Sequence, residues 1–148
     1  MTTTISAAEY ATLTGKPTRT KYGAKQVIVT EDGVLYDAKA AKANGIQGRR
    51  FDSKAEGARY VHLRLLEQGG YIRDLACQVK FELHGKDGSV VTRYFADFVY
   101  LEPDPVIAGA WHEVVEDRKG GTATATPVYK LKAKLMRAEY GVVIREIR

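Results

Sequence analysis

Cysteine is almost absent from this chain of 148 residues, because Cys77 is the only one. A single cysteine excludes an intrachain disulfide, which agrees with a reducing cytosol. Its place in an alternating apolar pattern predicts a buried structural thiol rather than a nucleophile. Histidine is scarce as well, and His62, His84 and His112 lack the close spacing of metal ligands. We therefore expect surface or packing roles for all three histidines.

Long apolar runs are also missing. No stretch approaches the roughly 20 apolar residues that a membrane-spanning helix needs. Residues 1–6 lack the basic region and apolar core of a signal peptide, and the doublet Gly120-Gly121 lacks the other residues of a phosphate-binding loop. These absences predict a soluble, intracellular protein without a membrane partner.

Positive charge, by contrast, is in excess. The chain holds 23 Lys and Arg against 18 Asp and Glu, which gives a formal net charge of +5 and a pI near 9.3. This balance suits a polyanionic partner without identifying one. With 45% apolar residues, the chain is long enough for one domain that buries roughly 70% of its unfolded surface. We expect that single domain, with one core, over residues 23–148.

Residues 1–22 are interpreted as a flexible basic tail, because they are rich in Thr and Ala and show no sustained period. The segment from residue 16 to residue 25 contains four basic residues and no acid: Lys16, Arg19, Lys21 and Lys25. A solvated tail is the simpler interpretation. The alternative is an arm that lies along the phosphates of a nucleic acid.

Turn signals and hydrophobic periods divide the rest of the chain into strands and helices. Asp32-Gly33 and Asp87-Gly88 predict hairpin turns. Asp37 is expected to open a helix, Ser53 and Thr126 are expected helix caps, and Pro127 suits a first helical position. The expected strands are residues 26–30, 34–36, 77–83, 90–101, 111–119 and 142–147, and the expected helices are 37–45, 54–68 and one from Pro127 to Gly141. The predicted fold class is α/β (α+β), with a central mixed β-sheet flanked by helices on both faces.

Two further basic segments carry expectations of their own. Residues 39–50 contain four basic residues and no acid, including Arg49 and Arg50, and would suit a loop that faces nucleic acid. The last helix is expected to bury a stripe formed by Val128, Leu131, Leu135 and Ala138. Its basic residues, Lys130 and Lys134 among them, would then cover the outer face, which usually means a solvated surface.

Two acidic positions have the strongest chemical content. Asp97 is the single acid inside an otherwise apolar run, where an unpaired charge would be costly to bury. In an extended segment from residue 111 to residue 119, Asp117 and Lys119 share one face and Glu116 lies on the other. Two strands that deliver Asp97 and Asp117 would form a site for a hard divalent metal with oxygen ligands, with Lys119 aimed at a phosphate.

These residues carry a resemblance to a known superfamily. A Glu on a helix, an Asp in a hairpin strand and Asp-x-Lys on the next strand resemble, in this order, the PD-(D/E)XK or restriction-endonuclease-like nucleases. Residues 51–60, 78–81, 94–100 and 115–120 resemble, more narrowly, a group of small phage-encoded nucleases. The resemblance covers the chain from about residue 22 to the C-terminus and implies a restriction-endonuclease-like core in a single nuclease domain.

The resemblance also implies roles for individual residues. Glu56, Asp97, Asp117 and Lys119 would be catalytic, with Mg²⁺ or Mn²⁺ held by the three acids and the backbone carbonyl of Arg118. Gln78 would help to hold the site, although a polar residue on an exposed strand face is an equal alternative. Local rules alone make Glu56 the partner of Ser53 in a capping box, so both interpretations of Glu56 stay open. The expected DNA-binding residues are Lys16, Arg19, Lys21, Lys25, Arg49, Arg50, Lys130 and Lys134.

The expected activity is that of an Mg²⁺-dependent DNA endonuclease in the cytoplasm of a phage-infected bacterial host. A chain without a separate recognition domain is better suited to reading DNA shape than a long base sequence. Branched DNA, such as a four-way (Holliday) junction, is therefore the expected substrate, cut by a homodimer because symmetrical cleavage of two strands needs two sites. The alternatives are a sequence-tolerant nicking nuclease and a catalytically silent DNA-binding module on the same fold.

Overall fold

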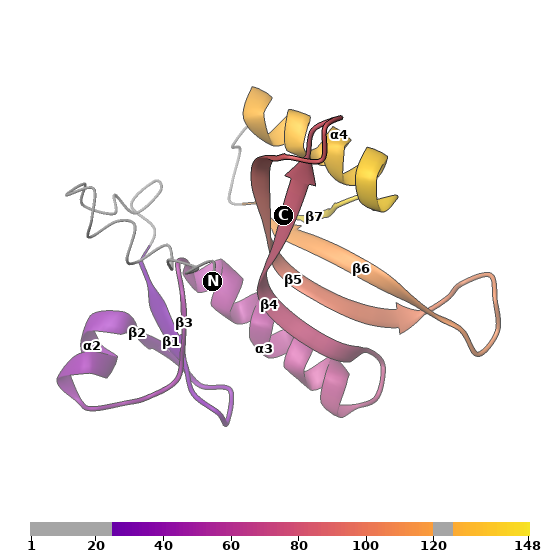
Figure 1. Ribbon diagram of the computed structural model, residues 1–148. Helices are drawn as coiled ribbons and strands as arrows, with labels where there is room; N and C mark the ends of the chain where they lie inside the picture. Colours follow the sequence, from indigo (N-terminus) through magenta and orange to yellow (C-terminus); the bar gives the residue numbers. More distant parts are fainter. Residues whose placement is uncertain (1–24, 120–125) are drawn as a thin grey trace, which may run out of the picture.

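A computed structural model describes residues 25–119 and 126–148 of the chain (Figure 1). The predicted tail at residues 1–22, with Lys16, Arg19 and Lys21, lies outside the described residues. The described part contains a four-stranded sheet, a three-stranded sheet and three helices. This arrangement confirms the mixed α and β composition. No helix in the described part is both long enough and apolar enough to cross a membrane.

The four-stranded sheet is mixed, as predicted. Its strands are β4 (Arg73–His84), β5 (Val90–Pro103), β6 (Trp111–Arg118) and β7 (Arg145–Ile147), in that spatial order. The β4–β5 and β5–β6 pairs are antiparallel, whereas β7 returns after a helix and pairs with β6 in parallel. The turn between β4 and β5 contains Gly88 at φ +81°, which is the backbone conformation that glycine adopts without steric cost.

The three-stranded sheet is small and antiparallel. It consists of β1 (Val27–Val29), β2 (Leu35–Asp37) and β3 (Arg49–Phe51), with β1 in the centre. The predicted β1–β2 hairpin is confirmed, but the loop expected over residues 39–50 is wrong at its end. Residues 49–51 form a strand because Phe51, only 3% exposed, joins the core beside Val27. Three residues with one buried side chain give no detectable period.

Three helices accompany the sheets, and each begins at a predicted cap. Helix α2 (Ala38–Ala43) follows Asp37, α3 (Lys54–Gln68) follows Ser53 and α4 (Pro127–Tyr140) follows Thr126. In each case the cap side chain accepts a hydrogen bond from a backbone N–H of the first turn. Helix α3 lies between the small sheet and the four-stranded sheet and contacts both (Figure 1).

The four-stranded sheet divides the apolar interior into two clusters rather than the single core expected. Phe98 and Val114 pack with Leu63 of α3 in one cluster. Their strand neighbours Val99 and Val115 pack with Met136 of α4 in the other. Since successive strand residues point to opposite faces, the two helices cover opposite faces of the sheet, as predicted.

The stripe predicted for α4 is correct at Leu135, which packs in the buried cluster, and wrong at its other three positions, which are exposed. Val128 and Leu131 are 62% and 58% exposed, whereas Met136 is fully buried. Tyr129 packs in the same cluster as Met136, and the ring of Tyr140 meets that of Phe81 on β4, with centroids 5.3 Å apart. The larger Tyr and Met side chains therefore define the buried face, which a count of aliphatic residues missed.

Candidate active site

Asp97 and Asp117 lie on neighbouring strands at the same level of the sheet. The β5–β6 register pairs Phe98 with Glu116, so one step further brings Asp97 opposite Asp117, and opposed side chains in a sheet stand about 5 Å apart. The backbone N–H of Arg118 donates to Asp97 Oδ2 at 2.7 Å. Burial raises the pKa of Asp97 to about 6, and the negative charge of Asp117 adds to that rise.

Lys119 lies beside Asp117, as the strand alternation predicted. Its Nζ donates to Asp117 Oδ2 at 2.6 Å and sits 3.5 Å from the centroid of the Tyr129 ring on α4. The Lys119 side chain retains 25% of its exposure. One ammonium group therefore contacts an acid and an aromatic ring while staying open to a ligand from solvent.

Glu56 joins the acids from the first turn of α3. Its backbone N–H donates to Ser53 Oγ at 3.1 Å, so the backbone forms the helix cap while the side chain points elsewhere. Glu56 Oε1 accepts from Gln78 Nε2 at 2.8 Å. Burial raises the pKa of Glu56 to about 7, with further contributions from the charges of Asp97 and Asp52. The backbone of Glu56 therefore belongs to the helix cap, while its side chain belongs to the group of acids around Asp97.

Gln78 connects two of these acids. Its amide nitrogen lies 2.8 Å from Glu56 Oε1 and 3.4 Å from Asp97 Oδ1. The backbone of Gln78 has φ +53°, a left-handed conformation that costs of order 1–3 kcal/mol for a residue other than glycine. Gln78 lies opposite Asp97 in the β4–β5 pair, and its left-handed backbone places the side-chain amide between the carboxylates of Glu56 and Asp97. Gln78 is also exposed on its strand, so the contact with both acids is observed and its supporting role stays a prediction.

Two buried tyrosine hydroxyl groups accompany the acids. Tyr94 is 4% exposed, and its pKa is raised by burial and by the charge of Asp117. The pKa of Tyr129 is raised by the same two causes in the same order. Within residues 25–119 and 126–148, neither hydroxyl has a hydrogen-bond partner, although buried polar groups usually have one. Sequence reasoning missed both tyrosines, because aromatic residues at such positions are typical of a core.

Glu116 and Arg118 point away from the acids. Glu116 is completely buried and accepts two hydrogen bonds from Arg59 of α3, at 2.7 and 2.8 Å, and one from the Tyr100 hydroxyl at 2.8 Å. The Arg118 guanidinium donates to the backbone carbonyls of Lys119 and Ile147. The predicted assignment of Asp117, rather than Glu116, to the face of Lys119 is confirmed. Arg59 is a partner that the sequence did not reveal.

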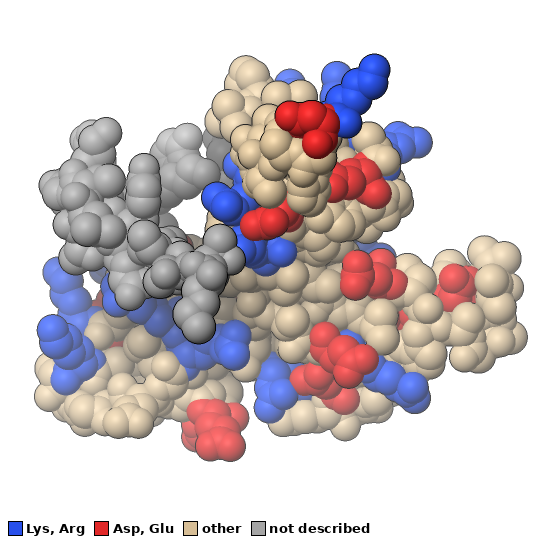
Figure 2. All heavy atoms as spheres, in the orientation of Figure 1, with Lys and Arg blue, Asp and Glu red and all other residues tan. Residues whose placement is uncertain are grey.

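The remaining DNA-binding candidates lie in two separate places. Lys25, Arg49 and Arg50 are exposed on and beside the small sheet, and Lys130 and Lys134 are exposed on α4. Figure 2 shows Lys and Arg side chains over the small sheet and others over α4. The structure therefore does not join these residues into one patch. The guanidinium group of Arg50 donates a hydrogen bond to the side-chain oxygen of Gln26.

Among the described residues, the three histidines contact residues other than the candidate acids, and Cys77 directly precedes Gln78 on β4. His62 contacts Arg59, His84 contacts Glu139 and His112 lies 3.1 Å from Glu102. Cys77 is half-buried, and burial raises the pKa of its thiol. In the described part of the chain, no three His, Cys, Asp or Glu side chains form a ready-made metal cage. The carboxylates around Asp97 form pairs rather than a closed group.

Comparison with curated proteins and with solved structures gave no match. A family match covers residues 38–147, which include every candidate acid, Gln78, Lys119 and the elements from α2 to β7. This match spans well over half of the chain. The chain belongs to the family described as "Protein of unknown function (DUF1064)".

Proposed function

We propose that this protein is a metal-dependent endonuclease that hydrolyses phosphodiester bonds in DNA and has a restriction-endonuclease-like core. The observation that carries the proposal is the approach of Asp97 and Asp117 from adjacent strands, with Lys119 Nζ 2.6 Å from Asp117. Glu56 arrives from a helix and is linked to Asp97 through Gln78. The order helix Glu, hairpin Asp, then Asp-x-Lys is the order of the nucleases that the sequence resembles.

The donor set fits Mg²⁺ or Mn²⁺. Mg²⁺ is usually held by one or two carboxylates together with water and substrate phosphates, not by a cage of protein ligands alone. A pair of aspartates with a third acid nearby suits that mode, so the lack of a three-ligand cage among the described residues is compatible with it. The raised pKa values of Asp97 and Glu56 indicate carboxylates that a cation would stabilise. The hydroxyl of Tyr94, whose pKa burial and the charge of Asp117 raise, offers a further oxygen beside them.

Each residue then has a defined task. Asp97 and Asp117 would hold the ion, and Glu56 would contact it directly or through water. The ion supplies neutralisation of charge on the phosphate and lowers the pKa of water. Lys119 would hold its ammonium group towards the same phosphate and stabilise charge that develops there. Because the N–H and C=O of one residue point to the same side of an extended strand, the Arg118 carbonyl would face Asp97.

We propose branched DNA as the substrate and a homodimer as the active form. The proposal rests on the small size of the described fold, whose two sheets and three helices offer little surface to read a long base sequence. Cleavage of two strands at a junction needs two active sites. A nicking enzyme that tolerates many sequences is the next alternative.

The decisive assay compares cleavage of an end-labelled four-way junction, a flap, a linear duplex and a single strand, with Mg²⁺ or with a chelator. Wild type is expected to cut only with metal. Asp117→Asn is expected to abolish cleavage, and Lys119→Ala to slow it by about 10²–10³-fold, the usual effect of removing a charge-stabilising group. Glu116→Gln is the matched control, because it alters the neighbouring acid on the opposite face and should retain much of the activity.

The reverse pattern, with Glu116→Gln inactive as a folded protein and Asp117→Asn active, would refute the assignment of the site. If wild type cuts none of the substrates with metal but shifts DNA in a gel, the silent DNA-binding module replaces the nuclease. The order of preference among the four substrates tests the choice of branched DNA separately.

A further inference from the structure

A cavity of about 460 Å³ lies between α3 and the turn that joins β1 to β2. A second cavity of about 400 Å³ adjoins it on the side of β4. Arg49, Tyr60 and Arg64 line both, so the two cavities form one groove with these three side chains in its middle. Both volumes fall within the roughly 300–1,000 Å³ that is typical of ligand sites.

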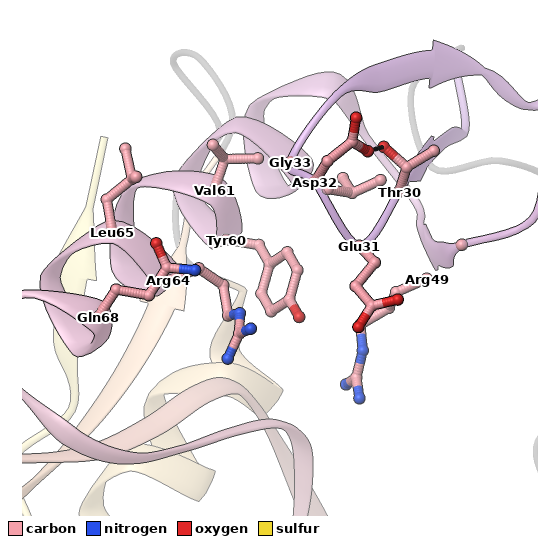
Figure 3. A pocket seen from close by; sticks show the side chains of 12 residues that line it. Thr30, Glu31, Asp32, Gly33, Arg49, Tyr60, Val61, Arg64, Leu65 and Gln68 are labelled. Carbon is pink, nitrogen blue, oxygen red and sulfur yellow. Dashed lines mark hydrogen bonds between the residues drawn. The ribbon is translucent and has the colours of Figure 1, made fainter.

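The middle of the groove combines positive charge with an aromatic ring. The Tyr60 ring enters from α3, between Arg64 on the same helix and Arg49 and Glu31 on the opposite side (Figure 3). The guanidinium carbon of Arg49 lies 5.7 Å from the centroid of the Tyr60 ring. No acid among the described residues forms an ion pair with the exposed Arg49, whereas Arg64 is paired with the half-buried Glu67 at 2.9 Å and its side chain is 42% exposed. The Arg49 guanidinium is therefore open to an anionic ligand, and Arg64 offers the N–H groups that Glu67 does not use.

The Tyr60 ring is held rigidly from behind. It packs against Phe51 with centroids 4.9 Å apart, and Phe51 packs against the fully buried Phe98 at 6.4 Å. This series of rings connects the groove to the core beneath α3. A ring fixed in this way offers a flat apolar surface at little cost in conformational entropy, as the aromatic platforms that stack on nucleobases do.

The groove lies next to the candidate active site along α3 and β4. Glu56, Tyr60 and Arg64 follow one another at intervals of four residues and so form one stripe along α3, which spans roughly 12 Å from Glu56 to Arg64. On the facing strand, Cys77 lines the groove, and the next residue, Gln78, contacts Glu56 at 2.8 Å. A polyanion that binds at Arg49 and Arg64 can therefore continue directly to the acids.

We propose that this groove binds an unpaired stretch of DNA next to the phosphate that is cleaved, with phosphates at Arg49 and Arg64 and one base against Tyr60. The proposal rests on the proposed nuclease function and deepens it, because it assigns the substrate a single-stranded segment. A paired base cannot leave its stack to enter a recess without unpairing. Glu31 and Asp32 at the far rim repel phosphates and can accept hydrogen bonds from base amino groups, so they give the bound strand a direction.

Binding can be tested without cleavage. A short fluorescein-labelled oligothymidylate and a duplex of the same length are titrated with protein in chelator, and dissociation constants are read from fluorescence anisotropy at several salt concentrations. The double variant Arg49→Gln/Arg64→Gln is expected to bind the single strand at least about tenfold more weakly. The slope of log K against log salt concentration should decrease by about 1.4, the value expected for the loss of two phosphate contacts on a single strand. The matched control is Lys86→Gln/Arg93→Gln on the exposed β4–β5 hairpin, which removes the same charge away from the groove and should change binding much less.

Tyr60 is tested by two substitutions. Tyr60→Leu should weaken single-strand binding about 5- to 150-fold, which corresponds to the loss of one base–aromatic stack, whereas Tyr60→Phe should bind like wild type. Thermal denaturation confirms that each variant is folded. Equal losses in the two double variants, or no loss in Tyr60→Leu, would overturn the proposal, as would a loss confined to the duplex. Because binding is measured in chelator, these outcomes do not depend on whether the protein cuts DNA.

Discussion

The ion pair between Arg59 and Glu116 allows a sharp test of how the two faces of β6 differ. Glu116 has no exposed surface, and Arg59 retains 18% of its side-chain exposure. Replacing Arg59 with methionine preserves a long unbranched side chain but removes both hydrogen bonds to the carboxylate. Glu116 would then be a buried charge with only the Tyr100 hydroxyl as a partner. Breaking a buried pair in this way costs about 3–5 kcal/mol.

For a chain of this size, each kcal/mol lowers the melting temperature by about 2–4 °C, so Arg59→Met should melt roughly 6–20 °C below wild type. The double variant Arg59→Met/Glu116→Gln should recover most of the loss, because no buried charge remains. The matched control is Arg64→Met on the same helix. Its ion pair with Glu67 is 42% and 25% exposed and should contribute less than about 1 kcal/mol.

Urea unfolding of wild type and the three variants provides the assay. A cost below about 1 kcal/mol, or a double variant no more stable than Arg59→Met, would contradict the claim that Glu116 is a structural acid held by this pair.

Three further predictions concern the acids and their supports. The folded-state pKa values of Glu56 and Asp97 are raised, to about 7 and about 6, so ionisation opposes folding. The free energy of unfolding of metal-free wild type, measured relative to Glu56→Gln, should fall by up to about 3 kcal/mol between pH 4.5 and 7, and a fall that Mg²⁺ leaves unchanged would contradict a metal site. Gln78→Gly should relieve about 1 kcal/mol of backbone strain in urea unfolding yet slow cleavage, and a loss of stability would contradict the strain. Gly57→Ala should destabilise the protein by about 1–3 kcal/mol in thermal denaturation, although alanine favours helices, because its Cβ would lie 2.7 Å from Val27 Cγ2. A gain in stability would mean that the small sheet moves to accommodate the added methyl group.

The sequence predicted well those features that depend on local chemistry. Each helix begins at the expected cap, and both Asp-Gly turns form hairpins, because capping and turn geometry involve only neighbouring residues. The alternation that separates Asp117 from Glu116 also held, since a regular strand of eight residues has a fixed period of two. These features include most of the frame that brings the acids together.

Features that depend on tertiary contacts could not be predicted in the same way. Strand β3 has three residues and a single buried side chain, which is too little for a period. The buried face of α4 is set by Tyr129 and Met136 together with Leu135, the one member of the predicted aliphatic stripe that packs there. The pairing of Arg59 with Glu116 spans 57 residues, and no local pattern indicates it. Each of these features is decided by what the folded chain packs against.

The contrast between Glu116 and the acids around Asp97 is the strongest physical argument for where chemistry takes place. Glu116 is the more deeply buried, yet it has an arginine and a tyrosine as partners and therefore fits a structural role. Asp97 faces another aspartate, Glu56 carries a raised pKa, Gln78 is strained, and the Tyr94 hydroxyl has no partner among the described residues. Departures from good packing and pairing persist mainly where function requires them. Their concentration around Asp97 supports a bound cation between these carboxylates, which is the central requirement of the proposed nuclease.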